Sequence, residues 1–575
     1  MPLVWNVRDR DLEASHELGR RLGVSSVTAQ ILLNRGLGDP DEAARFLAPD
    51  LLSLGEPEEM AGMVAAAERI HRAVSSRERI VVFGDYDVDG VSASSILVSL
   101  LSRLGATVES YLPDRATEGY GLSRAAVERI ATKGASLVVT VDCGIRSVAE
   151  AERAAELGLD LVVTDHHIPG PELPRAFAVV NPRRPDCPYP FKHLCGAGIA
   201  FKLAWALARR VSGKARVDPE LRDFLVEALT FAAVATIADV LPLVGENRVI
   251  AAFGLKRLAR PANPGLAALV EIAGIGRNGP PTAQDVGFGI APRINAAGRM
   301  GHASRALELF LTTDPARARE IAVELDRANR ERQREERGIF EEAIERIAPG
   351  DLERERAIVL ASETWHRGVI GIVAGRLAER FRRPVVLVAL SDGLGRGSAR
   401  SIPAYHLCDA LDRVGEHMES HGGHAGAAGL EIRADRLDRF RVAFLSDARE
   451  RIRPEDMAAE LDIDLECPLA AVDRRLLAEM ERLAPFGEGN PTPVFVTPDL
   501  SVAGLPRRMG DRGQHLSFVV RQGDASLRAV AFNRGDLYPE FAEGRSTFSL
   551  AYTPVLNRFR GSESVELHME DVSFP

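Results

Sequence analysis

Short apolar runs alternate with helical repeats between residues 80 and 180. Mostly β-branched runs predict strands at 80–84, 107–111, 136–141, 161–164 and 176–180. Between these runs, apolar residues recur at the spacing of one helix face, which predicts helices at 93–104, 123–132 and 147–157. Strands joined by helices are typical of a parallel, doubly wound sheet, whose functional groups gather at the carboxyl ends of the strands.

The patterns outside this region predict further domains. Residues 219–238 form a long apolar repeat, and residues 315–347 combine Arg and Glu with apolar positions at helical intervals, as in an exposed connecting helix. New α/β elements start at residue 357, and short alternating strands beyond residue 493 fit a small β-barrel. We therefore expect a helical N-terminal lead-in (1–50), a larger α/β domain (51–312), a connecting helix (313–350), a smaller α/β domain (351–458) and a C-terminal β-barrel (459–575).

The composition is that of a globular protein. Of 575 residues, 46% are hydrophobic and 27% are charged, which argues against long disordered segments. We expect no membrane span and no secretion signal, and five cysteines without a CxxC pair suit a reducing cytoplasm. The net charge of −10 argues weakly against nonspecific nucleic-acid binding, since a basic groove can lie on an acidic body.

Acidic and imidazole side chains follow several of the predicted strands. They are Asp85, Asp87 and Asp89 after 80–84, Asp142 after 136–141, and Asp165-His166-His167 after 161–164. Any one aspartate could be a turn or N-cap residue, but so many like charges at one sheet edge predict a divalent metal site. Asp239, which ends the repeat 219–238, would ordinarily be a cap residue; beside an incomplete metal site it becomes a candidate ligand.

The smaller α/β domain contains polar, glycine-rich segments, which we predict to be loops. They lie at 365–371, 395–401 and 421–426. Exposed backbone N–H groups beside Ser, Arg and His suit phosphate binding, although each segment alone could be ordinary turn chemistry. Together they favour a binding surface.

The triplet Asp165-His166-His167, paired with the aspartates of 85–90, resembles the DHH phosphoesterase superfamily. The chain is more similar still to the RecJ family of 5′→3′ single-strand-specific DNA exonucleases. The segment 291–300 (APRINAAGRM) resembles a stretch particular to that family, and Gly422-Gly423-His424 resembles the loop of its DHHA1 domain. The resemblance spans nearly the whole chain and implies that the C-terminal barrel is an OB-fold.

The resemblance also implies roles for individual residues. Asp142 would bridge two metal ions and, with His166 and His167, belong to the catalytic group; His167 would lie close to the scissile phosphate. Phe83 stands where related small phosphatases have a histidine, so the shell of the first ion must differ from theirs. The implied metal ligands are Asp85, Asp87, Asp89, Asp142, His166 and Asp239. The implied substrate contacts are Arg299, Ser398, Arg400 and His424 for the 5′-phosphate, with Arg293 and Asn295 in the segment 291–300.

The implied activity is release of 5′-mononucleotides from single-stranded DNA, in recombination and repair. Two-metal hydrolysis would use Mn²⁺, with Mg²⁺ as a possible substitute. A monomer is expected, and single-strand-binding protein and a RecQ-type helicase are expected partners. The alternatives are a small-substrate phosphodiesterase or oligoribonuclease, and a non-catalytic single-strand-binding scaffold. The barrel and the segment 291–300 argue against the first, and the complete set of acids and histidines argues against the second.

Overall fold

The computed structural model describes residues 3–115, 117–213, 216–277, 279–300, 303–543, 547–559 and 562–574. These residues divide into two compact units. The larger unit comprises residues 6–298, 303–325 and 462–574, and the smaller unit comprises residues 3–5, 299–300 and 326–461. Within the described ranges, no helix is both long enough and apolar enough to cross a membrane.

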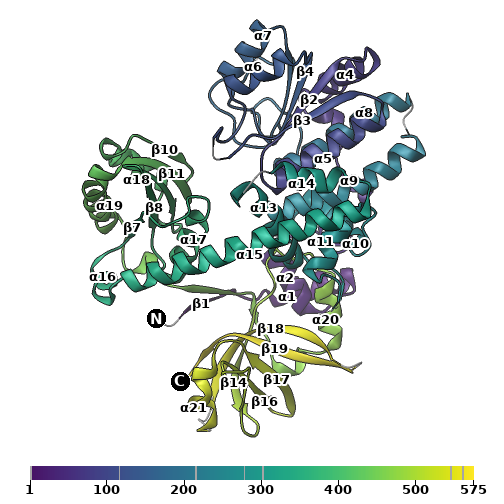
Figure 1. The fold of residues 1–575 in the computed structure, drawn as a ribbon. Helices are drawn as coiled ribbons and strands as arrows, with labels where there is room; N and C mark the ends of the chain where they lie inside the picture. Colours follow the sequence, from purple (N-terminus) through teal and green to yellow (C-terminus); the bar gives the residue numbers. More distant parts are fainter. Residues whose placement is uncertain are drawn as a thin grey trace. The chain divides into compact units, whose positions relative to one another are not determined.

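The larger unit contains a five-stranded parallel sheet, which lies near the top of Figure 1. Its strand order is β3-β2-β4-β5-β6, with each neighbouring pair parallel. The order places the first strand inside the sheet, as in doubly wound folds, so that prediction is confirmed. The strands are β2 (Arg79–Phe83), β3 (Thr107–Tyr111), β4 (Leu137–Val141), β5 (Asp160–Thr164) and β6 (Ala178–Val180).

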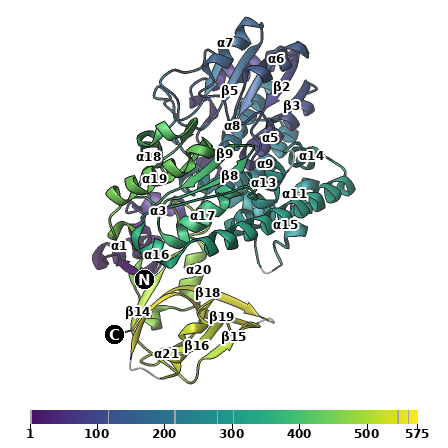
Figure 2. The same ribbon diagram turned by 60° about the vertical axis from the view of Figure 1, so that its left-hand side comes forward.

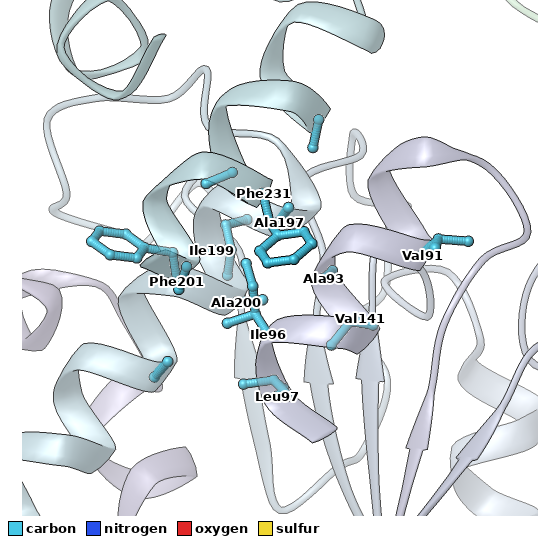
Figure 3. Close-up of a cluster of buried hydrophobic side chains, with 14 of the residues drawn as sticks. Val91, Ala93, Ile96, Leu97, Val141, Ala197, Ile199, Ala200, Phe201 and Phe231 are labelled. Carbon is cyan, nitrogen blue, oxygen red and sulfur yellow. The ribbon is translucent and has the colours of Figure 1, made fainter. Parts of the chain in front are cut away.

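Helices bury both faces of this sheet. One face packs on α4, α5 and α8, with α9 behind them, and the other packs on α6 and α7. In Figure 3, Ile96 and Leu97 of α5 lie close to Ala200 of α8, and Phe231 of α9 lies next to Ala197. The helices are α4 (Met63–Ser75), α5 (Val88–Arg103), α6 (Arg124–Thr132), α7 (Val148–Glu156), α8 (Gly196–Ser212), α9 (Pro219–Ala238), α10 (Gly245–Leu258), α11 (Pro264–Ala273), α12 (Ala283–Asp285), the π-helix η3 (Val286–Ile290), α13 (Ala291–Met300) and α14 (Ser304–Leu311).

Helix α5 begins earlier than its apolar spacing predicted. It starts at Val88 rather than at residue 93, because the Asp87 side chain caps it by accepting the backbone N–H groups of Asp89 and Gly90. Asp89 therefore lies in the first helical turn instead of in a loop. Asp87 and Asp89, two of the candidate metal ligands, are therefore fixed at the N-terminus of α5.

The C-terminal strands close into a barrel (yellow in Figure 2). The ring runs β14-β18-β19-β17-β16 and returns to β14 through the β14–β16 pairing, which confirms the predicted OB-type barrel. The lead-in helices share its hydrophobic cluster. The elements are α1 (Leu12–Leu22), α2 (Ser26–Asn34), α3 (Pro40–Leu47), β13 (Leu465–Glu466), α20 (Arg474–Glu481), β14 (Phe495–Val502), β15 (Arg507–Met509), β16 (His515–Gln522), β17 (Ala525–Ala531), α21 (Tyr538–Ala542), β18 (Phe548–Phe559) and β19 (Ser562–Ser573).

The smaller unit contains a mixed sheet with the order β10-β11-β9-β8-β7. Helix α17 packs on one face of it, and α18 and α19 pack on the other. The elements are β7 (Ile358–Ser362), α16 (Pro349–Arg354), α17 (Ile370–Phe381), β8 (Val385–Ser391), β9 (Leu394–Arg400), α18 (Leu407–Arg413), β10 (Ser420–Gly423), β11 (Ala427–Arg433) and α19 (Leu437–Arg451). The long helix α15 (Pro315–Arg346) belongs to both units, and β1 (Val4–Val7) pairs with β12 (Glu460–Ile463).

Two of the glycine-rich segments predicted to be loops form strands instead. Most of 395–401 is β9, and part of 421–426 is β10. The glycines permit close side-chain packing in the sheet: a Cβ at Gly397 would lie 2.7 Å from Leu430 Cγ. The prediction of loops failed because a glycine-rich turn and a tightly packed, glycine-rich strand have the same composition.

Candidate active site

The carboxyl ends of β2, β4 and β5 bring acids and histidines together. His166 Nε2 lies 3.0 Å from Asp142 Oδ1 and 3.6 Å from Asp89 Oδ2. The same nitrogen lies 3.8 Å from Asp239 Oδ2, although Asp239 comes from the end of α9 and not from the sheet. The edge of the sheet therefore gathers side chains from four separate segments, as the strand-end rule predicted.

The six implied ligands fall into overlapping groups that could each hold an ion. Asp85, Asp87 and Asp142 have ligand atoms within 4.8 Å of one another, and so do Asp89, His166 and Asp239. Asp142 also belongs to a group with His166, so it lies between the two sets. Carboxylate oxygens with one imidazole suit Mn²⁺ or Mg²⁺ better than they suit a soft metal.

Two of the loop aspartates are anchored by helix N-termini. Asp87 caps α5 through one carboxylate oxygen. Asp89 accepts the backbone N–H of Gly196 on Oδ2 and that of Ala197 on Oδ1, both at 2.6 Å, at the start of α8. The capping interpretation of these aspartates is thus correct for Asp87. It does not compete with metal binding, because a carboxylate offers four acceptor sites.

Backbone geometry at Asp142 depends on a glycine from α8. Asp142 has φ 61°, in the left-handed region, which is costly for a residue other than glycine. Gly196 packs directly on it: a Cβ at position 196 would lie 2.6 Å from Asp142 Cβ and 2.9 Å from Asp142 Cα. The same glycine donates its N–H to Asp89, so one residue positions two members of the cluster.

Burial and mutual repulsion disfavour the charged forms of these acids. Burial raises the pKa of Asp142 well above its ordinary value, and the charge of Asp89 raises it further. The same two causes raise the pKa of Asp239 to about 8. Asp85 Oδ1 is buried and accepts no hydrogen bond from any described residue. A divalent cation would satisfy that oxygen and reverse the repulsion, so the residues fit a divalent metal.

Asp165 has a different task from the other acids. Its Oδ1 accepts the backbone N–H groups of His166 (2.7 Å) and His167 (3.1 Å) and contacts His167 Nδ1 at 2.7 Å. Its Oδ2 accepts the N–H of Ile145 at 2.9 Å. Burial alone would lower the pKa of His167, but the hydrogen bond to Asp165 and the charges of Asp165, Asp239 and Asp89 together outweigh burial and raise that pKa. Asp165 therefore orients His167 and favours its protonated form.

Two further neighbours of His167 were missed in the sequence. The Tyr120 hydroxyl lies 3.1 Å from His167 Nδ1 and 3.3 Å from the Asp142 carbonyl oxygen. Asn181 Nδ2 donates to the His167 carbonyl oxygen at 2.9 Å. Asn181 directly follows β6, so the strand-end rule could have identified it. No sequence signal marked Tyr120, which lies in a segment between a strand and a helix.

The implied phosphate contacts lie around the first turn of α17 in the smaller unit. A Cβ at Gly371 would lie 2.8 Å from Ser398 Oγ and 3.3 Å from Arg400 Nη2, so these side chains converge on the helix N-terminus. Arg299 Nη1 donates to the Gly368 carbonyl oxygen at 3.1 Å, just before that helix. A helix N-terminus beside arginine and serine is suited to a phosphate.

The remaining implied contacts are held by other parts of the chain. The exposed His424 donates its backbone N–H to the carbonyl oxygen of Ala427, which pairs with Arg400 across the sheet. In the larger unit, Asn295 Oδ1 accepts the N–H of Val88 at 3.1 Å, so this side chain supports the first turn of α5. Arg293 donates to the Gly289 carbonyl oxygen one helical turn back.

The barrel carries an exposed cluster of aromatic rings. Phe532 is 51% exposed, and its ring centre lies 5.5 Å from that of His515 and 5.1 Å from that of His568. On the same barrel, the guanidinium of Arg508 lies over the ring of Tyr538. Exposed rings beside arginine can stack unpaired bases.

Family models match consecutive parts of the chain. The DHH family N-terminal domain matches residues 79–232, the DHHA1 domain matches residues 355–450, and the RecJ OB domain matches residues 463–571. The chain is 38% identical to the single-stranded-DNA-specific exonuclease RecJ of Bacillus subtilis, over 99% of this chain and 70% of that protein. It is 36% identical to the protein of the same name from Escherichia coli, over 90% of this chain and 91% of that protein.

Solved structures agree with these matches. The crystal structure of RecJ from Thermus thermophilus in complex with Mn²⁺ superposes with a TM-score of 0.84 at 33% identity, covering 100% of this chain and 80% of that one. The corresponding Mg²⁺ complex gives a TM-score of 0.79 at 31% identity, covering 100% of this chain and 78% of that one.

Proposed function

The chain belongs to the RecJ family of single-stranded-DNA-specific exonucleases, and from that premise we propose that it degrades single-stranded DNA from the 5′ end. The products are 5′-mononucleotides, released by hydrolysis at a centre of two divalent ions. The single observation that carries the proposal is the overlapping set of acids around His166 and Asp142 at the sheet edge. The activity serves DNA recombination and repair, where single-stranded ends arise.

The proposed ions are Mn²⁺ by preference, with Mg²⁺ as a substitute; the solved structures of RecJ from Thermus thermophilus include a complex with each ion. Bound between the carboxylates, such ions would lower the pKa of a water molecule and neutralise charge that develops on the phosphate. The proposed ligands are Asp85, Asp87, Asp89, Asp142, His166 and Asp239. Because Asp87 and Asp89 are anchored to backbone N–H groups, little reorganisation is needed there when the ions bind.

His167 contributes at the scissile phosphate rather than to the metals. Asp165 fixes its Nδ1 and raises its pKa, so Nε2 can present a proton to a phosphate oxygen or to the leaving 3′-oxygen. Asn181 and Tyr120 hold the backbone and ring of His167 in place. This arrangement separates a metal-binding histidine, His166, from a substrate-facing one.

The pocket at α17 supplies the polarity of digestion. Ser398 and Arg400, with Arg299, would bind a terminal 5′-phosphate at the helix N-terminus, so that each hydrolysis step presents a new 5′-phosphate to the same pocket. Arg400→Ala should then abolish the preference for 5′-phosphate over 5′-hydroxyl ends and leave Mn²⁺ binding unchanged. Arg396→Ala is the matched control, because Arg396 lies on the same strand and pairs with Glu431 instead. An unchanged preference in Arg400→Ala excludes this residue from the pocket.

The barrel would hold the trailing single strand. Bases stacking on Phe532, His515 and His568 would add affinity without sequence preference. Phe532→Ala should weaken binding of long single strands by about 1–3 kcal/mol, the usual contribution of one stacked base. Cleavage of oligonucleotides too short to reach the barrel should be unaffected.

One assay separates this function from its alternatives. The protein is offered 5′-phosphorylated single strands, duplexes and dinucleotides with Mn²⁺, and wild type is compared with Asp142→Ala. We expect cleavage of single strands only, lost in the variant. Cleavage confined to dinucleotides would identify a small-substrate phosphodiesterase, and strand binding without any cleavage would identify a scaffold.

The cellular setting follows from the substrate. A cytoplasmic, monomeric enzyme would receive its strands from a RecQ-type helicase and from single-strand-binding protein. Gel filtration with light scattering tests the monomer, and stimulation of digestion by each added protein tests the partners.

A further inference from the structure

Asp239 reaches the metal site from a turn that the metal-binding sheet does not support. It ends α9, and the residues that follow, 240–244, form a tight turn into α10. Val240 has φ 54°, a conformation that is unfavourable for a β-branched residue. Its side chain is 65% exposed, so packing does not hold it. The end of α9 holds Val240 itself, because the Val240 N–H donates to the Ile237 carbonyl oxygen at 3.2 Å and the Leu241 N–H donates to that of Thr236 at 3.1 Å. Further contacts hold the rest of the turn, at residues 242 and 243.

Those contacts come from the loop that leads into the C-terminal barrel, residues 485–491. The Leu243 N–H donates to the Glu488 carbonyl oxygen at 2.7 Å. Gly487 lies against Leu243, where a Cβ would be 2.8 Å from Leu243 Cδ1. Gly489 lies against Pro242, where a Cβ would be 3.0 Å from Pro242 Cβ. The loop and the turn are thus in direct contact over successive residues.

Consecutive residues at the start of α10 hold the turn and the loop together. Asn247 Nδ2 donates to the Pro242 carbonyl oxygen at 3.1 Å, on the turn. Arg248 is buried, and its guanidinium donates to the carbonyl oxygens of Leu483 (2.8 Å), Arg482 (3.0 Å) and Ala484 (2.8 Å), on the chain that enters the loop. The loop also closes on itself, because Gly487 and Asn490 exchange backbone hydrogen bonds.

We propose that loop 485–491 is a positioning element of the metal centre, which holds the turn 240–244 in the conformation that directs Asp239 at His166. The inference rests on the proposed function, in which Asp239 is a metal ligand. It makes the segment before the barrel part of the nuclease site, although this segment is distant in sequence from the ligand that it positions. The barrel would then do more than bind the strand, since the chain that carries it also supports the position of a proposed metal ligand.

The test variant is Gly489→Ala. The backbone at Gly489 has φ +68°, which is unfavourable for alanine, and the added Cβ would crowd Pro242. The turn must therefore shift. The matched control is Gly523→Ala in the hairpin between β16 and β17, which has φ +58° and no atom within 4 Å of an added Cβ. Both changes strain the same barrel-bearing segment of the chain, and only the first touches the turn. Circular dichroism and thermal unfolding check that both proteins fold.

Mn²⁺ binding to the metal-free protein is measured by isothermal titration calorimetry. We expect Asp239→Asn to abolish the binding of one equivalent of Mn²⁺. Gly489→Ala should weaken the binding of that same equivalent by about 10–100-fold, which is the usual effect of changes to residues that support a metal ligand. Gly523→Ala should match wild type. Adding Gly489→Ala to Asp239→Asn should cause no further loss, because both changes act through the same ligand.

The outcomes distinguish a failure of the positioning role of the loop from a failure of the proposed metal centre. If Asp239→Asn weakens binding but Gly489→Ala matches Gly523→Ala, the positioning role is wrong and the proposed metal centre stands. If Asp239→Asn binds like wild type, both the ligand assignment and the positioning role are wrong. Should Gly489→Ala fail to fold, Pro242→Ala removes the ring packed on Gly489 from the other side. It should weaken the same equivalent about tenfold, and unchanged binding would refute the inference.

Discussion

Replacing Asp165 by asparagine tests the idea that this acid serves His167 and not a metal ion. In the protein, four N–H groups converge on the Asp165 carboxylate, three on Oδ1 and one on Oδ2. Asparagine has the same shape but a single accepting oxygen, so its NH₂ group must face at least one N–H donor. The least costly orientation keeps the oxygen toward the histidines and leaves the buried N–H of Ile145 unpaired.

The magnitude follows from those contacts. An unpaired buried donor costs about 1–3 kcal/mol, and three hydrogen bonds lose the assistance of a charge, at roughly 1 kcal/mol each. The segment around His167 is then less stable by about 4–6 kcal/mol on these values. In the proposed mechanism His167 is the general acid, so its displacement should lower kcat by about 10²–10⁴-fold.

The pH dependence of kcat/KM tests the coupling between Asp165 and His167 directly. Because Asp165 raises the pKa of His167, the protonated ring persists to higher pH in the wild type and is lost as the pH rises through that raised value. In Asp165→Asn the alkaline decline in kcat/KM on a 5′-phosphorylated single strand should move to lower pH. His167→Ala should show no such decline, and adding Asp165→Asn to it should cost little more.

Asp160→Asn is the matched control, since Asp160 begins the same strand and pairs with Arg69 at 2.5 Å, away from the site. It should keep the wild-type profile. An alkaline decline at the same pH in wild type and Asp165→Asn would refute the coupling between Asp165 and His167.

Further predictions concern the supports of the site and of the two units. Gly196→Ala places a Cβ against Asp142 and should weaken Mn²⁺ binding, measured by calorimetry, by about 10–100-fold. Gly198→Ala is the control, because the nearest atom to its Cβ would be 3.4 Å away, and this variant should bind Mn²⁺ normally. Equal affinities of the two variants would contradict the role of Gly196 packing. Arg248→Met removes the hydrogen bonds to the carbonyl oxygens of Phe46, Arg482 and Ala484, at about 1 kcal/mol each, whereas the Leu483 oxygen keeps the donor Asn490 Nδ2. The change also regains part of the cost of a buried charge, whose burial lowers the pKa of Arg248 to about 9. It should lower the free energy of unfolding in urea by up to about 3 kcal/mol and expose the chain before the barrel to proteases; an unchanged midpoint would contradict this. Burial alone would raise the pKa of Asp447, but hydrogen bonds from two arginines and a tyrosine hold it at about 2. Its contribution is present above the unfolded value near 4 and is lost as the pH falls toward 2, so the stability difference between wild type and Asp447→Asn should be about 2 kcal/mol at pH 7 and vanish near pH 2.

The sequence predicted the sheet and the convergence of the acids because both follow from local patterns. Strand periodicity identifies β2, β4 and β5, and the topology of parallel sheets places their carboxyl ends together. That Asp239 lies at this sheet edge was predicted only because the metal site lacked a ligand. In the sequence, an aspartate that caps a helix and one that binds a metal look the same. The structure brings the Asp239 carboxylate within 3.8 Å of His166, and this depends on the packing of α9 against the sheet helices, which a single sequence does not record.

Other features depend on contacts between distant segments, which a single sequence does not record. The division of labour between Asp165 and Asp142 is set by the direction of backbone N–H groups in two turns. The packing of the lead-in helices on the barrel joins residues far apart in the chain, as when Glu479 accepts the Ser25 N–H at 2.7 Å. The sequence predicted a helical lead-in at 1–50 but gave no indication that it packs on the barrel.

The arrangement of backbone donors explains how so many acids coexist at one sheet edge. Helix N-termini hold Asp87 and Asp89, and the turns after β4 and β5 hold Asp165, so the protein supplies partial positive charge to each of these carboxylates from its own backbone. Asp85 and Asp142 instead have a buried oxygen without a hydrogen bond from any described residue. The carboxylates with backbone donors are held in place. The Oδ1 atoms of Asp85 and Asp142, the second of which lies 3.0 Å from His166 Nε2, are the ones that we propose to contact a cation. The backbone therefore compensates part of the negative charge at this sheet edge, and we propose that a divalent cation compensates the charge that remains at Asp85 and Asp142.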